Sequence, residues 1–63
     1  MAIKTKHSLR VQIEEVEREI RMRRDVYPRQ VSRKRMRHGE AEERIAMMES
    51  VLATLQELQK EKE

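Results

Sequence analysis

The fold is decided by residues 26 to 39, which read VYPRQVSRKRMRHG and lie between two stretches of helical periodicity. Pro28 has no backbone N–H and crowds the preceding turn, so it either ends a helix just before it or kinks that helix. Val31 lies four residues beyond Tyr27, which keeps both residues on one helical stripe. We therefore expect a first helix over residues 8 to 33, kinked at Pro28.

An apolar stripe upstream of the proline supports the first helix. We expect Ser8 to be its N-cap, because the hydroxyl can accept a hydrogen bond from an amide of the first turn. The residues that follow at spacings of four, three and four are Leu9, Ile13, Val16 and Ile20. Arg23 and Tyr27 take the next two positions of this stripe. Spacings of four residues from acid to base predict the ion pairs Glu14 with Arg18, Glu17 with Arg21, and Glu19 with Arg23.

A second apolar stripe predicts a second helix over residues 39 to 60. Its members are Ala41, Ile45, Met48, Leu52 and Leu55, with Val51 and Leu58 widening it. Three glutamates in its first turn are favoured there by the helix dipole. The connection of a few residues forces the helices to run antiparallel. The sequence therefore predicts an all-α antiparallel two-helix hairpin, a single small domain over residues 1 to 63 with a flexible basic arm at residues 1 to 7.

The second stripe is broader than a contact between two helices requires. A chain of 63 residues with one aromatic side chain has a thin core, since domains of this size bury only about 60% of their unfolded surface. Met47, Val51 and Leu58 are left as a protein interface outside the hairpin. We expect a homodimer in which two hairpins form a four-helix bundle. The alternative is that this surface is reserved for a different protein.

Basic residues are concentrated at the junction of the two helices. Residues 21 to 38 contain eight of the fifteen basic residues and a single acid, Asp25, a net charge of +7 against +3 for the whole chain. Such a block is expected to attract an anionic partner, either nucleic acid or an acidic protein surface. The alternative is a solvated connection that only aids solubility. The candidate anion-binding residues are Arg23, Arg24, Arg29, Arg33, Lys34, Arg35 and Arg37.

Other classes of function find no support in the sequence. The chain has no cysteine, and the spacing of His38 and Glu42 offers only two metal ligands, so we expect neither a metal nor a cofactor. No phosphate-binding glycine loop or nucleophile motif is present, and a two-helix hairpin lacks a concave pocket, so we expect no enzymatic activity and no small-molecule substrate. No apolar run is long enough for a membrane span or a signal peptide, which favours a cytoplasmic protein.

Residues 26 to 55 combine Val-Tyr-Pro-Arg with a second stripe of fixed register, at Val26, Tyr27, Pro28, Arg29, Val31, Met36, Ala41, Ile45, Met48, Val51, Thr54 and Leu55. In this pattern the chain resembles a family of small helical-hairpin proteins of unknown function encoded by bacteriophages and prophages. Relatives often have glycine at the position of Lys34 and a serine or threonine cap at that of Arg37, and this chain departs at both. The resemblance implies a phage origin, a helical hairpin and a location in a bacterial host cell. It supplies no reaction and no ligand.

Two functions are consistent with these features. The first is a small phage-type binding protein whose arginine-rich bend engages nucleic acid or an acidic host or phage protein. The alternative is a protein interaction module that inhibits or modulates a host or defence enzyme through the Met and Val face of the second helix.

Overall fold

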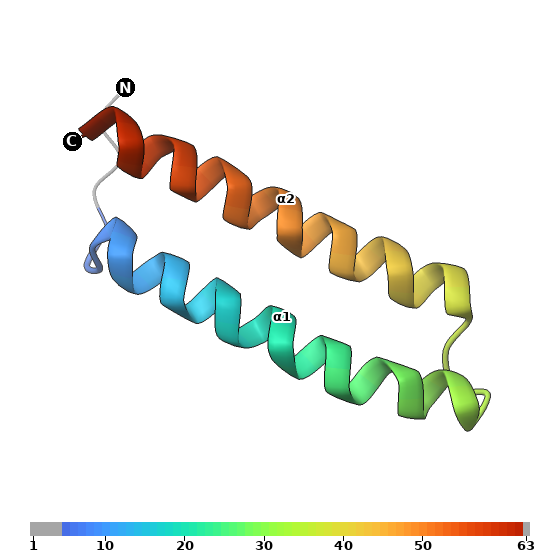
Figure 1. Ribbon diagram of the computed structural model, residues 1–63. Helices are drawn as coiled ribbons and strands as arrows, with labels where there is room; N and C mark the ends of the chain where they lie inside the picture. Colours follow the sequence, from blue (N-terminus) through green and yellow to red (C-terminus); the bar gives the residue numbers. More distant parts are fainter. Residues whose placement is uncertain (1–4, 63) are drawn as a thin grey trace.

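The computed structural model describes residues 5 to 62 as two helices that lie side by side in opposite directions (Figure 1). Helix α1 is Leu9–Ser32 and helix α2 is His38–Lys62, and residues 33 to 37 join them at one end. The hairpin measures 43 Å along its longest axis and 17 Å along the other two. The predicted all-α hairpin is confirmed, with α2 beginning one residue earlier and ending two residues later than expected.

Helix α1 begins at the predicted cap and continues across the proline. Ser8 has an extended backbone (φ −65°, ψ 162°), and its hydroxyl accepts a hydrogen bond from the N–H of Val11 at 3.3 Å, so this cap is confirmed. Pro28 has no N–H to donate to the carbonyl of Arg24, four residues earlier. Because Pro28 is exposed, water can reach this part of the helix and the missing bond costs less than it would in a core. The predicted continuation past Pro28 is confirmed, since α1 ends at Ser32.

The segment before α1 is linked to the first turn by one side chain. Gln12 donates its amide to the hydroxyl of Thr5 at 3.3 Å and to the carbonyl of His7 at 2.9 Å. These bonds hold Thr5 and His7, which belong to the basic arm expected at residues 1 to 7, against the start of α1. Residues 1 to 4 of that arm lie outside the described residues.

Two inward-facing stripes form the contact between the helices. The buried members are Ile13 and Ile20 in α1 and Ala41 in α2, each between 5 and 8% exposed. Half-buried apolar residues extend the stripes at spacings of three and four: Leu9, Val16, Tyr27 and Val31 in α1, and Ile45, Met48, Leu52 and Leu55 in α2. These spacings hold one narrow stripe of each helix against the other. The core is therefore a single seam.

The chain leaves α1 through a left-handed turn at Lys34, which has a φ of 60°. The N–H of Lys34 donates to the carbonyl of Val31 at 3.0 Å, and the N–H of Arg35 donates to that of Gln30 at 2.9 Å. These two bonds form a Schellman motif, in which the left-handed position usually holds glycine. A residue with a Cβ atom costs roughly 1–2 kcal/mol in this conformation. Lysine is therefore an unfavourable residue for the backbone of this turn.

Replacement of Lys34 by glycine is expected to stabilise the hairpin, because glycine has no Cβ atom to clash in the left-handed conformation. Lys34→Ala is the matched control, since it removes the same charge and keeps the Cβ atom. We expect the free energy of unfolding of Lys34→Gly to exceed that of Lys34→Ala by about 1 kcal/mol. Urea denaturation followed by circular dichroism at one protein concentration measures the difference. Equal free energies for the two variants would contradict the turn described above.

Candidate functional site

The seven predicted anion-binding residues fall into two groups, according to whether the charged group has a partner within the chain. Members of the first group each pair with a carboxylate, and they are Arg23, Arg24 and Arg29. Members of the second group form no ion pair and no side-chain hydrogen bond with any described residue, and they are Arg33, Lys34, Arg35 and Arg37. We call this second group the bend cations.

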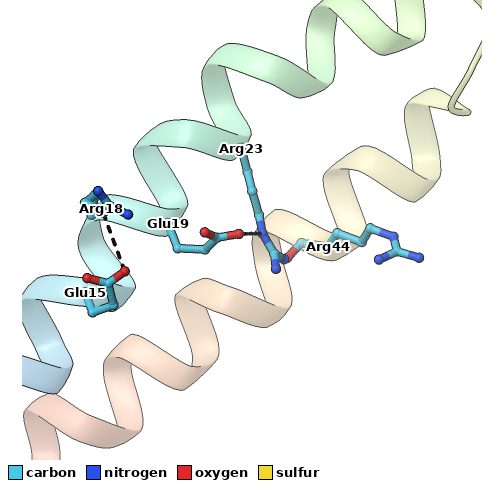
Figure 2. Close-up of polar contacts among 5 residues, drawn as sticks. All are labelled: Glu15, Arg18, Glu19, Arg23 and Arg44. Atoms are coloured by element: carbon cyan, nitrogen blue, oxygen red, sulfur yellow. Dashed lines mark hydrogen bonds and ion pairs between the residues drawn. The ribbon is translucent and has the colours of Figure 1, made fainter. Parts of the chain in front are cut away.

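Arg23 belongs to the contact between the two helices (Figure 2). Its Nε donates to Glu19 Oε1 at 2.8 Å, and its Nη1 donates to the backbone carbonyl of Arg44 in α2 at 3.1 Å. The guanidinium carbon lies 5.9 Å from the centroid of the Tyr27 ring, within the range of a cation–π contact. The side chain is only 23% exposed. We therefore leave Arg23 out of the candidate site.

Arg24 and Arg29 are exposed, but carboxylates neutralise them. Arg24 Nη2 donates to Glu49 Oε2 across the two helices, and Arg29 Nη2 donates to Asp25 Oδ1 at 2.9 Å within α1. Exposed pairs of this kind contribute only about 0–1 kcal/mol. An incoming anion could displace these carboxylates, but it would gain little because the local charge is already balanced. These two arginines therefore lie at the margin of the candidate site.

The bend cations occupy the end of the hairpin where the chain passes from α1 to α2. All four are exposed, and they lie within five consecutive residues. Three of them help to line a shallow hollow, whose lining is Val31, Lys34, Arg35, Met36, Arg37 and Glu40. Val31 and Met36 are half-buried, so the hollow combines apolar surface with three positive charges and one carboxylate, that of Glu40. This combination fits an anionic group carried on an apolar or planar body.

The two helix ends at the bend act on these charges in different ways. The carboxyl end of α1 carries a partial negative charge, which favours the cations that follow it, Arg33, Lys34 and Arg35. Arg37 directly precedes α2, and its carbonyl accepts a hydrogen bond from the N–H of Ala41 at 3.0 Å. The arginine side chain has no acceptor atom with which to cap the first amide groups of α2. Those amide groups and the bend cations favour negative charge at the same end of the hairpin.

The ion pairs predicted along α1 are only partly correct. Glu19 with Arg23 forms as expected. The expected pairs that do not form among the described residues are Glu14 with Arg18 and Glu17 with Arg21. Glu14 pairs instead with Arg10 at 3.2 Å, and Arg18 pairs with Glu15 at 3.5 Å (Figure 2). Glu14 has a base four residues away on each side, and two such exposed pairs have similar energies, so spacing does not choose between them. Nothing in the structure explains the absence of the Glu17–Arg21 pair.

The predicted protein interface lies on α2, beside the seam. Its exposed fractions are 52% for Met47, 43% for Val51 and 41% for Leu58. Together with Thr54 these residues follow spacings of four, three and four, which places them on one stripe of the helix. We call these four residues the α2 stripe. On α1, Val11 and Met22 are each 48% exposed and fall outside the spacing of the seam.

Two further features bear on the chemistry open to the chain. His38 Nε2 lies 2.8 Å from Glu42 Oε1, and within residues 5 to 62 no third potential metal ligand joins them in a cluster. Neither α1 nor α2, the two helices described, is both long and apolar enough to cross a membrane.

Comparison with protein-family models, with curated proteins and with solved structures finds no match to this chain. A function must therefore be argued from the charge and geometry of the bend and of the α2 stripe.

Arg23 and Arg33 are expected to differ in their effect on stability, although each carries one positive charge in the same basic block. Arg23→Gln should lower the free energy of unfolding by about 1–2 kcal/mol, because it removes hydrogen bonds from a charged donor and the contact with Tyr27. Arg33→Gln should change it by less than about 0.5 kcal/mol. Urea denaturation measures both values. Equal losses in the two variants would contradict the division into paired arginines and bend cations.

Proposed function

We propose that this chain is a small non-enzymatic binding protein whose bend cations bind nucleic acid or an acidic protein surface. One observation carries the proposal. Four basic residues within five consecutive positions at the bend have no carboxylate partner in the described chain, whereas Arg23, Arg24 and Arg29 each have one. Arg21, the remaining basic residue of the block, has none either but lies alone on α1. The densest group of uncompensated positive charges therefore lies at one end of the hairpin. The resemblance to phage and prophage proteins extends the proposal to a phage-type protein acting in the cytoplasm of a bacterial host.

The conformation of Lys34 supports a role for the charge itself. This residue holds a φ of 60°, where glycine would form the same turn without the steric cost of a side chain. Residues kept in costly conformations are concentrated at functional sites. A cation at this position adds to the field of its neighbours, which glycine could not do. Lys34 thus lowers the stability of the turn and adds a fourth positive charge to the bend.

Contacts from the bend would be made mainly to phosphate or carboxylate oxygens. Arginine and lysine that neutralise phosphates release counterions, so the slope of log affinity against log salt is about −0.9 per phosphate contact on duplex DNA. Four such contacts predict a slope of roughly −3.6, or a loss of about 150-fold in affinity between 50 and 200 mM salt. Phosphate contacts carry no sequence information. We therefore propose binding that depends on charge and not on base sequence.

Replacement of all four bend cations by glutamine is expected to abolish binding of a labelled oligonucleotide in fluorescence anisotropy. The reason is that the variant lacks every uncompensated charge of the bend. The matched control makes four changes to glutamine at exposed basic residues elsewhere, namely Arg10, Arg18, Arg21 and Lys60. This control has the same net charge, and it should keep most of the affinity and most of the salt dependence. Equal losses in both variants would show that net charge alone governs binding and would refute a site at the bend.

The same measurement separates the two classes of anionic partner. A labelled polyglutamate peptide presents carboxylates without phosphates or bases. Binding of the oligonucleotide alone supports nucleic acid as the partner, and binding of polyglutamate alone supports an acidic protein surface. If neither probe binds at low salt, the proposed function is wrong.

The exposed α2 stripe favours a second candidate function. In this alternative the chain is a protein interaction module that inhibits or modulates a host or defence enzyme through Met47, Val51 and Leu58. Such an interface would depend on a few central apolar residues. The variant with four glutamines at the bend would then still inhibit or modulate the enzyme. Glutamate at any of these three positions would remove that inhibition or modulation.

A further inference from the structure

The α2 stripe is suited to packing against another helix. Met47, Val51 and Leu58 present large apolar side chains that are between 41 and 52% exposed. Thr54 completes the stripe, and its hydroxyl donates to the carbonyl of Ser50 at 3.1 Å. The polar group of Thr54 is therefore satisfied within its own helix, so its methyl group can be buried without leaving an unpaired donor.

The hairpin exposes more surface than a compact monomer of its mass. A monomer of 7.7 kDa is expected to expose about 4,300 Å². This chain exposes 5647 Å², an excess of roughly 1,300 Å² over that value. A standard protein interface buries about 800 Å² on each partner. Covering one long face of the hairpin would therefore bring its exposed surface close to the ordinary range.

We propose that the covering molecule is a second copy of this chain, with the two α2 helices packed antiparallel along their stripes. A two-fold axis that passes between Val51 and Thr54 places Val51 opposite Thr54 of the second copy. The same axis places Met47 opposite Leu58 of the second copy. The spacings of four, three and four then match the register in which side chains of two packed helices interlock.

The charges on α2 are complementary in this register. Arg44 lies opposite Glu61 of the second copy, and Glu43 lies opposite Lys62 of the second copy; all four side chains are exposed. Arg44 also pairs with Glu40 of its own helix, at 3.5 Å, and its guanidinium has enough N–H donors for both carboxylates. Two α2 helices packed parallel and in register would instead place each charge opposite its own kind, which is destabilising. The charge pattern therefore favours the antiparallel arrangement.

This dimer would carry its two bends at opposite ends. With the axis between residues 51 and 54, α2 begins about 22 Å from the axis in each copy, so the two bends lie roughly 45 Å apart. The α2 stripe and the bend cations are separate surfaces. The dimer proposal does not depend on the ligand of the bend, and the variant with four glutamines at the bend should remain dimeric.

Sedimentation equilibrium tests the assembly. At about 100 µM, above the micromolar dissociation constants of weak interfaces of standard size, the chain should have twice its mass of 7.7 kDa. Val51→Glu should raise the dissociation constant at least about tenfold, because it places two carboxylates near the axis. Val11→Glu is the matched control, since Val11 is similarly exposed, at 48%, but lies on α1. A monomeric mass for the unchanged chain, or equal weakening by both variants, would overturn the proposal.

Spin labels test the register. The chain has no cysteine, so single changes Glu42→Cys and Ala53→Cys each place one label on each copy at an exposed position. In the antiparallel dimer the two labels at position 42 are about 32 Å apart along the helix axis, and those at position 53 are within about 2 Å along it. Electron–electron double resonance should therefore give a much longer distance for position 42. Similar distances at both positions would exclude the antiparallel α2 contact, whatever the mass.

Discussion

The structure depends on a single seam, in which one narrow stripe of α1 packs against one narrow stripe of α2. Ile13, Ile20 and Ala41 are its buried members, and half-buried apolar residues extend it along both helices. Because the seam uses only one face of each helix, it leaves the remaining faces uncovered, including the α2 stripe. It also brings the end of α1 and the start of α2 so close that residues 33 to 37 suffice to join them. The thin core, the exposed apolar stripe and the crowded bend are therefore consequences of one packing arrangement.

The bend cations lack partners because the nearest carboxylates are already engaged. Asp25 pairs with Arg29, and Glu40 pairs with Arg44. Glu42 lies against His38 in the first turn of α2. The turn itself contains no acid, so mutual repulsion between the cations is opposed mainly by water and by the negative end of the α1 dipole. A bound anion would relieve this repulsion, which is the physical reason for proposing an anion-binding site at the bend.

Features that depend on local spacing could be predicted from the sequence, and features that depend on helix register could not. The seam and the Ser8 cap follow from residue types three and four positions apart, and the helix boundaries were predicted to within two residues. The pairing of Arg24 with Glu49 depends on how α2 is shifted along α1, which no spacing within one helix determines. The left-handed turn was also missed, because Lys34 gives no turn signal of the kind that glycine gives. Of the seven predicted anion-binding residues, the sequence therefore did not show which three pair with carboxylates inside the chain.

The start of α1 and the end of α2 lie together at the end of the hairpin opposite the bend (Figure 1). A fluorophore, a surface tether or a fused carrier attached near either of these helix ends would stand nearly the full 43 Å length of the hairpin away from the cations. Immobilisation of a single copy through that end would leave its own bend pointing into solution. One hairpin can thus be attached at its helix ends while its own bend cations stay accessible.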